Sequence, residues 1–536
     1  MTVSRRNVLK VGVFGGAALL LPLERTVGAN TSTPPRLASS ALPEPFTIPF
    51  TTPPVLKAFR TDASISTDYY KLYMRAFQTE VIPGLKTTLW GYGGVFPGRT
   101  VPVPTFPGPT FNVKQGRKTV VRQVNNLPAR HPTLHYTPWT SVHLHGSPSD
   151  PQYDGYASDV TNPGQYKDYR YPNTSSARTF WYHDHGVSHT AENVYMGLAA
   201  QYVIHDDKEL ALSIPHGIYD VPLIINDVMF QPDGSLLFDN HDGSGMYGDV
   251  ILANGVPWPA MKVTKRKYRF RLLNASVSRS YNFFLDSGDA FTVIGTDQGL
   301  MEHPVRVTSL RAGMAERYEI VIDFSKYPTG RRVVLGNRSP KNNIVYPNTD
   351  KVMAFDVVND AFDPSNNSIP DPLTAPNPTM ALRVADAVKT RQFEFKRDGG
   401  QFTINGHTWA DVVASGFTRI EANPRFGDTE LWVVRNESGG WFHPVHVHLV
   451  EFKIVDRNGR PPFAYEVGPK DTVYVGEGDT VRLLIHFEGR GKYLMHCHNL
   501  VHEDHDMMTQ FQVFDDARPS FDPFSAPPLA LPEGPL

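Results

Sequence analysis

The sequence predicts an all-β protein, and three observations favour this class. The 46 Pro and 42 Gly are spread through 536 residues without a period, which indicates many turns between short strands. Short runs alternate apolar and polar residues, and no long stretch has the period of an amphipathic helix. The strand-like runs include residues 118–124, 268–272, 317–322, 430–434 and 480–485.

Length and composition exclude several classes of protein. A chain of 536 residues predicts three or four domains at roughly 150 residues each, and it excludes a small disulfide-stapled module. Hydrophobic residues make up 40% and charged residues 20%, as in a soluble globular protein. The net charge is -2, and no run of Lys and Arg alternates with aromatic residues, so neither nucleic acid nor a membrane surface is an expected partner.

Residues 1–29 are typical of an export signal. Arg5 and Arg6 precede an apolar run over 11–21 that is too short to span a bilayer, and 27–29 resemble a small-residue cleavage site. Paired arginines of this kind resemble a twin-arginine signal. We therefore expect a prokaryotic protein that is exported folded, to the periplasm, the cell surface or the medium, with no transmembrane segment in its mature form. An ordinary signal peptide or a membrane anchor is the alternative.

The rest of the chain divides at stretches rich in proline. We expect a Pro-rich lead-in, a linker and a Pro-rich tail at residues 30–54, 366–384 and 521–536. Between them, the sequence predicts three β domains, at residues 55–207, 208–365 and 385–520. These three ranges are called the first, middle and third segments below.

Histidines recur in four His-x-His pairs, although random placement of 20 histidines gives roughly 0.7 such pairs. The pairs are His143/His145, His183/His185, His446/His448 and His496/His498. Residues two apart on a strand point to the same face, so eight imidazoles can line one metal cluster. The middle segment contains no such pair. One pair alone would more often be ordinary hydrogen-bonded histidines, but four pairs favour a metal site.

The single cysteine, Cys497, belongs to a second candidate site. By strand parity it faces away from His496 and His498, and His443 likewise faces away from His446, unless Pro444 disturbs the alternation. With His502 they supply one thiolate and two imidazoles, and Met507 is available as a weak axial ligand. This is the ligand set of a blue-copper electron-transfer centre. A hydrolase that uses only zinc is an alternative, but it leaves Cys497 and Met507 unexplained.

These motifs resemble those of the multicopper oxidases, which are built from three cupredoxin domains. The last motif of that family is His-Cys-His, with a histidine five residues after the cysteine and the axial ligand ten residues after it, and residues 496–498, 502 and 507 match this spacing. The resemblance extends from about 85 to 515 and is closest to bilirubin oxidases and spore-coat laccases. It is carried by residues 176–185, 190–195, 254–259, 267–271 and 502–508.

The resemblance implies three Greek-key β-barrel or sandwich domains and four copper ions. It assigns His143 and His446 to a type 2 copper. It assigns a type 3 pair to His145, His183, His185, His448, His496 and His498, and a type 1 copper to His443, Cys497, His502 and Met507. The three-copper cluster would lie between the first and third segments, and the middle segment would serve mainly as a spacer.

The resemblance also implies a reaction and its catalytic residues. Small phenolic, aminophenolic or bilirubin-type donors would lose single electrons at the type 1 copper, and O2 would be reduced to water by four electrons at the cluster. Cys497 and its two neighbours would link the sites, and Asp154 and Glu503 match positions that deliver protons. From sequence alone, Asp154 is equally a turn residue and Glu503 a solvated surface residue. Trp441 matches a tryptophan near the donor site, or is plain core.

Other functions stay open at this stage. An aminophenol oxidase is one, and a structural or copper-sequestering surface protein with little turnover is another. A cuprous oxidase is not expected, because the chain lacks a methionine-rich segment. The loop over 126–141 is longer than in typical bilirubin oxidases, and its His131 and His135 are expected in a solvent-exposed loop rather than on a metal.

Overall fold

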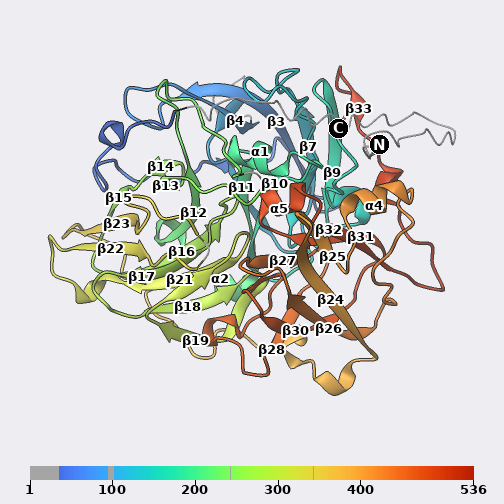
Figure 1. Cartoon of the computed structure of the whole chain (residues 1–536). Coiled ribbons are helices and arrows are strands. Elements are labelled where there is room, and N and C mark those ends of the chain that lie inside the picture. Colours follow the sequence, from blue (N-terminus) through green and yellow to red (C-terminus); the bar gives the residue numbers. More distant parts are fainter. Residues whose placement is uncertain (1–34, 95–101, 242, 342) are drawn as a thin grey trace. The chain divides into compact units, whose positions relative to one another are not determined.

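The computed structural model describes residues 35–94, 102–241, 243–341 and 343–536. Within it, residues 36–536 form one compact unit (Figure 1). The expected export signal lies outside the described residues, as do residues 30–34 of the lead-in. In the part of the chain that is described, α-helices reach at most six residues, and none is long and apolar enough to cross a membrane. The all-β prediction is confirmed.

The first segment folds into two sheets. Its elements are β1 (Val55–Leu56), β2 (Arg60–Asp62), β3 (Thr67–Thr79), β4 (Thr87–Gly94), β5 (Val103–Thr105), β6 (Thr110–Lys114), β7 (Lys118–Asn125), β8 (Val142–His145), β9 (Gln165–Tyr171), β10 (Arg178–Asp184), α1 (Thr190–Tyr195) and β11 (Ala199–His205). One sheet has the order β1-β6-β11-β10-β8, and the other contains β9-β7-β3-β4-β5, with β2 on β3.

The middle segment also folds into two sheets. Its elements are α2 (Asp207–Leu210), β12 (Asp220–Val228), β13 (Val250–Ala253), β14 (Val256–Pro257), β15 (Ala260–Val263), β16 (Lys267–Asn274), β17 (Tyr281–Leu285), β18 (Phe291–Thr296), β19 (Gly299–Val307), β20 (Leu310–Ala312), β21 (Arg317–Asp323), β22 (Arg332–Asn337) and β23 (Lys351–Val357). The sheets have the orders β14-β13-β12-β16-β21-β18-β19 and β15-β23-β22-β17-β20.

The third segment supplies the last pair of sheets. The remaining elements are α3 (Pro378–Ala381), β24 (Lys389–Asp398), β25 (Gln401–Ile404), α4 (Trp409–Ala414), β26 (Thr429–Asn436), β27 (His443–Val447), β28 (Phe452–Arg457), β29 (Thr472–Val475), β30 (Thr480–His486), β31 (Gly491–Cys497), α5 (Leu500–Asp504), β32 (Met508–Val513) and β33 (Leu529–Ala530). The sheets are β25-β24-β26-β30-β28 and β29-β27-β31-β32. β33, in the Pro-rich tail, returns to pair with β9 of the first segment.

One strand arrangement recurs in all three segments. A parallel pair is followed by an antiparallel neighbour in β3-β7-β9, in β12-β16-β21 and in β24-β26-β30. All five strand-like runs of the sequence lie in such sheets, within β7, β16, β21, β26 and β30. The domain boundaries themselves stay a prediction.

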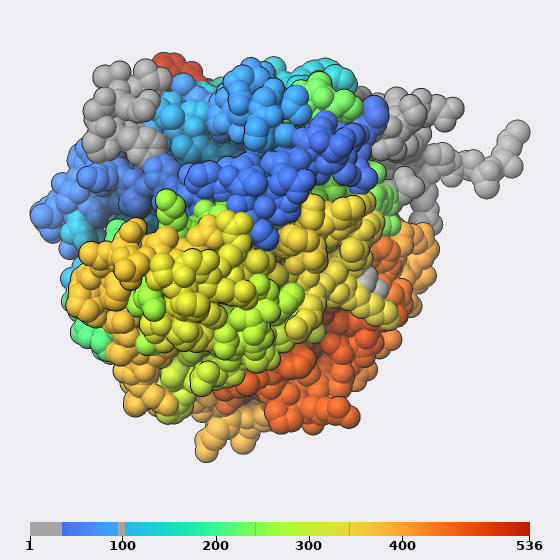
Figure 2. Space-filling model, turned by 90° about the vertical axis from the view of Figure 1, so that its left-hand side faces the viewer, coloured from blue at the N-terminus to red at the C-terminus, as the bar shows by residue number. Residues whose placement is uncertain are grey.

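The hydrophobic core joins the first two segments. One large cluster of buried side chains runs from Leu37 through the first and middle segments, and a separate one fills the third. Figure 2 shows the blue first segment above the green and yellow middle segment, with red residues of the third segment below. The first and third segments also meet each other, and their histidine-bearing strands lie at that contact.

Candidate metal centres

The structure brings the eight histidines of the four pairs together in one buried site between the first and third segments. Each is at most 1% exposed. His143 lies opposite His183 in the register of β8 and β10, and His446 lies opposite His496 in that of β27 and β31. Because opposite residues on antiparallel strands share a face, each segment presents its imidazoles to the other.

Ring nitrogens from the two segments face one another at short range. The Nε2 atoms of His143 and His446 are 3.4 Å apart. His496 Nε2 lies 3.1 Å from the Nε2 atoms of both His185 and His448, which makes a triad. The other three rings, those of His145, His183 and His498, have centroids 5.2 to 5.8 Å apart.

The ring nitrogens of these histidines fit a set of metal ions. Buried ring nitrogens of the cluster without a hydrogen-bond partner are His145 Nδ1, His183 Nε2, His185 Nδ1 and both nitrogens of His498. Burial lowers the pKa of the His185 imidazole to about 4. Buried polar atoms require partners, and a bound cation is the partner that two facing lone pairs can share.

A second centre lies on the other face of β27 and β31. Cys497 Sγ is 3.2 Å from His443 Nδ1 and 3.8 Å from His502 Nδ1, and the two Nδ1 atoms are 3.3 Å apart. The outer nitrogens are held: His443 Nε2 contacts the Ser438 hydroxyl at 2.7 Å, and His502 Nε2 contacts the Ser244 carbonyl at 3.1 Å. All three candidate ligands are buried, so this group also fits a metal ion.

Strand parity predicted the separation of the two centres, and Pro444 does not disturb it. Cys497 lies opposite Val445, and His443 is two residues before Val445, so both point away from His446 and His496. Met507 is fully buried beside them: its backbone N–H donates to the His502 carbonyl, and its carbonyl accepts from the Cys497 N–H.

Asp154 and Glu503 both lie within the histidine cluster. Asp154 Oδ2 accepts from His448 Nδ1 at 2.7 Å, and burial raises the pKa of this carboxyl well above its usual range. Glu503, in α5, has Oε2 2.9 Å from His496 Nδ1 and Oε1 3.4 Å from His185 Nδ1. Burial raises the pKa of Glu503, but those two imidazoles outweigh it and bring the pKa below its ordinary value. Glu503 is therefore not a solvated surface residue.

Comparison with known proteins identifies a family of copper enzymes over most of the chain, in agreement with the two candidate metal centres. Three multicopper oxidase family models match residues 104–209, 222–343 and 375–517. A bilirubin oxidase from Albifimbria verrucaria is 41% identical over 492 residues, which cover 87% of this chain and 81% of that protein. The chain belongs to the multicopper oxidases.

A second relative and a solved structure are also similar to this multicopper oxidase. A laccase from Bacillus subtilis strain 168 is 34% identical over 504 residues, 83% of this chain and 94% of that protein. The solved structure of McoA multicopper oxidase from Aquifex aeolicus matches with a TM-score of 0.76 at 28% identity, covering 88% of this chain and 99% of that one. The protein is therefore a copper-dependent oxidase with O2 as acceptor and cupredoxin-like domains, as the sequence motifs predicted.

Aromatic side chains cover the Cys497 centre of this multicopper oxidase. Phe402 stacks on His502 with ring centroids 4.0 Å apart, and Trp441 meets the same ring edge-on at 5.3 Å. The Arg397 guanidinium lies 5.3 Å from the Trp441 ring. Trp441 is only partly buried, so it is not plain core but part of the surface above His502.

Sequence reasoning missed a third carboxylate of the cluster, Asp471. Its Oδ1 accepts from His145 Nε2 at 3.0 Å, and its backbone carbonyl accepts from His446 Nδ1 at 2.8 Å. Asp471 is fully buried. No spacing rule relates it to His145, which lies 326 residues earlier, so the only available signal was its place directly before β29, the strand that pairs with β27.

His131 contradicts the expectation of a solvent-exposed loop. Although most of residues 128–135 are exposed, its side chain is buried, and its Nδ1 accepts from the Leu134 N–H at 3.1 Å. Its ring stacks on Tyr136, and burial lowers the pKa of His131 to about 4. The aromatic contacts pull this one side chain inward, whereas His135 stays exposed.

A cavity of 1370 Å³ is lined in part by residues that directly follow cluster histidines in the sequence. Its lining includes Gly146, which follows His145, and Leu449, which follows His448. Arg178 and Gln298 also line it. Among the described residues that line this cavity there is no cluster histidine.

Proposed function

We propose that this oxidase couples the one-electron oxidation of small phenolic, aminophenolic or bilirubin-type donors to the four-electron reduction of O2 to water. The observation that carries the proposal is the position of Cys497, between a thiolate-imidazole centre and a cluster of eight imidazoles. The relatives named as a bilirubin oxidase and a laccase support the donor classes.

The proposal includes four copper ions, which supply the one-electron redox chemistry when bound. His443, Cys497, His502 and Met507 would hold a type 1 copper. His143 and His446 would hold a type 2 copper. The triad His185, His448 and His496 and the triad His145, His183 and His498 would each hold one type 3 copper. The facing nitrogens described above support the His143/His446 pair and the triad His185, His448 and His496. The unpartnered ring nitrogens of His145, His183 and His498 support the third group.

Three consecutive residues connect the two proposed centres. The Cys497 side chain faces His443 and His502, whereas His496 and His498 belong to the cluster. The link is covalent throughout, and its surroundings are dry because all three residues are at most 1% exposed. A donor that gives one electron at a time can thus serve an acceptor that needs four.

Asp154 and Glu503 would handle the protons of the reaction. Asp154 is positioned to hold a proton, because burial raises the pKa of its carboxyl. Glu503 would be the ionised member of the pair, because His185 and His496 keep the pKa of its carboxyl below the ordinary value. The partly buried Trp441, edge-on to His502, marks the surface where an aromatic donor would dock.

We also propose that the chain is exported through the twin-arginine route to the periplasm, cell surface or medium. The support is the Arg5-Arg6 pair and the short apolar run that follows it. Replacing both arginines by lysine should trap the protein inside the cell, and unchanged export of this variant would contradict the route.

The test of the function is oxygen uptake by copper-loaded protein with bilirubin, o-aminophenol, a methoxyphenol and Cu(I) as donors, with peroxide assayed in parallel. Uptake without peroxide is the expected result, and the fastest organic donor identifies the substrate class. Peroxide release in proportion to oxygen uptake would contradict four-electron reduction. Full copper loading without uptake from any donor would favour a copper-sequestering protein.

A further inference from the structure

Asp471 fixes the orientation of two cluster histidines at once. Its carboxylate takes the Nε2 hydrogen of His145, so only Nδ1 of that ring is left to face the cluster. Its backbone carbonyl takes the Nδ1 hydrogen of His446, whose Nε2 then faces His143. One residue thus selects opposite ring nitrogens on two candidate ligands from different segments.

The middle segment holds Asp471 in place. Arg317, the first residue of β21, donates from both terminal nitrogens to the two carboxylate oxygens of Asp471, with Nη1 at 2.7 Å from Oδ1. Gln298, in the turn between β18 and β19, donates from Nε2 to Oδ2 at 2.6 Å. Asp297 in the same turn accepts the backbone N–H of Asp471 and of Thr472 at 3.2 Å. Two-point arginine pairs of this kind fix a carboxylate in position as well as in charge.

The same two side chains reach the first segment. Arg317 Nε donates to the Thr179 carbonyl at 3.1 Å, in β10, the strand that carries His183. Gln298 Nε2 also donates to the carbonyl of Gly146 at 3.0 Å, the residue after His145. Arg317 and Gln298 therefore each join the middle segment to both other segments. Their contacts at Thr179 and Gly146 lie four residues from His183 and one residue from His145.

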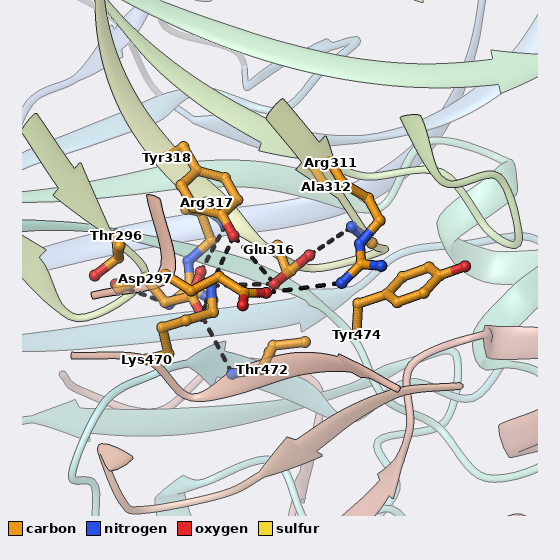
Figure 3. Close-up of polar contacts among 12 residues, drawn as sticks. Thr296, Asp297, Arg311, Ala312, Glu316, Arg317, Tyr318, Lys470, Thr472 and Tyr474 are labelled. Carbon is orange, nitrogen blue, oxygen red and sulfur yellow. Dashed lines mark hydrogen bonds and ion pairs between the residues drawn. The ribbon is translucent and has the colours of Figure 1, made fainter. Parts of the chain in front are cut away.

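Further buried charges surround this junction. Figure 3 shows Asp297, Arg317 and Lys470 directed toward one another, and Lys470 Nζ lies 3.0 Å from Asp297 Oδ2 and 3.1 Å from Glu316 Oε1. All of these side chains are at most 1% exposed. Removing one member of such a buried network leaves its partners uncompensated, so the network holds its geometry firmly.

We propose that Asp471 is a positioning residue for the histidine cluster and that the middle segment, through Arg317 and Gln298, holds it there. The middle segment contributes no candidate ligand, yet it determines which ring nitrogens of His145 and His446 face the cluster. This inference rests on the proposed function, because it takes the cluster as the copper site. The middle segment would then do more than separate the other two segments, because it would hold Asp471 in the position that orients His145 and His446.

The experiment uses the copper-loaded, full-length protein and its Asp471→Asn and Arg317→Lys variants. A chelator is added, and the copper lost from each centre is followed separately: blue absorption reports the Cys497 centre, and total copper less that amount reports the cluster. We expect Asp471→Asn to retain cluster copper about 10- to 100-fold more weakly, with blue absorption unchanged. Arg317→Lys keeps the charge but loses the two-point pair, so a smaller weakening in the same centre is expected.

Arg122→Lys is the matched control. Arg122 is 1% exposed and makes the same two-point pair, with Asp168, at 2.7 Å from both nitrogens, but the pair contacts no cluster histidine. The Arg122→Lys variant should retain copper in both centres as the wild type does. Gln298→Leu removes one hydrogen-bond donor to Asp471 without changing the charge. This variant replaces Asp471→Asn in the experiment if Asp471→Asn does not fold.

Two outcomes would overturn the inference. Wild-type retention of cluster copper by the folded variants would show that Asp471 does not position the ligands. Equal loss from both centres would show a general destabilisation. A wild-type protein that loads no cluster copper would instead refute the proposed function.

Discussion

His446 lies directly opposite His496 on adjacent antiparallel strands, and the neighbouring pair in the same ladder is Val445 with Cys497. A step of one residue along the ladder therefore moves from one candidate metal centre to the other, because successive side chains leave opposite faces of a sheet. The two centres are separated by the thickness of β27 and β31. This separation needs no loop and no linker, only the alternation of a strand.

Replacing Cys497 by serine should remove the blue absorption and abolish donor oxidation while the fold is retained. Cys497 Sγ lies 3.2 Å from His443 Nδ1 and 3.8 Å from His502 Nδ1, and a serine hydroxyl at this place is a poor copper ligand. Absorption spectra, copper analysis and oxygen uptake test this expectation. Retained donor oxidation in the variant would refute the proposed electron path.

Glu503→Gln should slow turnover by about 10²- to 10⁴-fold, the contribution typical of one acid-base group. The substitution keeps the shape of the side chain but removes the carboxylate that faces His185 and His496. Stopped-flow and steady-state kcat measure the effect, with copper content and blue absorption checked first. Glu488→Gln, at a carboxylate 79% exposed, is the control and should leave kcat unchanged. A normal kcat in Glu503→Gln would remove this residue from the proton pathway.

Trp441→Ala should raise KM for aromatic donors several-fold and leave KM for O2 unchanged. The indole meets the His502 ring at 5.3 Å and is partly exposed, so its loss removes stacking surface for a donor without touching the cluster. Steady-state kinetics with the donor and with O2 as the varied substrate separate the two effects. A change in KM for O2 alone would place the role of Trp441 elsewhere.

His131 makes folding stability depend on pH. Burial lowers the pKa of the folded state from 6.5 to about 4, so between these values the unfolded chain binds the proton and the folded chain does not. Stability is therefore fully present above about pH 6.5 and is lost as the pH falls toward 4, by about 3 kcal/mol in total. Denaturant unfolding of wild type and His131→Asn at several pH values measures this. The wild type should lose more stability than the variant over this interval, and parallel curves would contradict the prediction.

Gly146→Ala should destabilise the fold more than Gly116→Ala. Both glycines have positive φ, +95° and +78°, so alanine costs about 1 kcal/mol in strain at either site. At Gly146 the new Cβ would also lie 2.6 Å from the Phe180 ring and 2.8 Å from Asp471 Oδ2, whereas Gly116 has open space. Overpacking adds about 1–3 kcal/mol at Gly146. Equal unfolding free energies for the two variants would show that the Phe180 ring and the Asp471 carboxylate both move away easily.

The sequence predicted the parts of the site that follow from local spacing. The His-x-His pairs and the parity of Cys497 needed only the period of a strand, and the structure places them as that period requires. Asp471, Arg317 and Gln298 could not be found in this way. The Asp471 carboxylate meets His145 across 326 residues, and Arg317 and Gln298 meet Asp471 across 154 and 173 residues. The expectation that His131 is exposed was wrong. Its burial depends on stacking against Tyr136, and the sequence of a polar, Pro-rich loop does not reveal that contact. The pairing of β33 with β9 likewise depends on tertiary contacts alone.

The three-way contacts of Arg317 and Gln298 have a consequence for protein engineering. A chimaera that takes its middle segment from another multicopper oxidase inherits whatever that relative carries at these two positions, while Asp471, Thr179 and Gly146 stay with the recipient. Exchange of this segment is therefore not modular: a graft that brings both side chains preserves the junction, and one that brings neither requires compensating changes in the recipient.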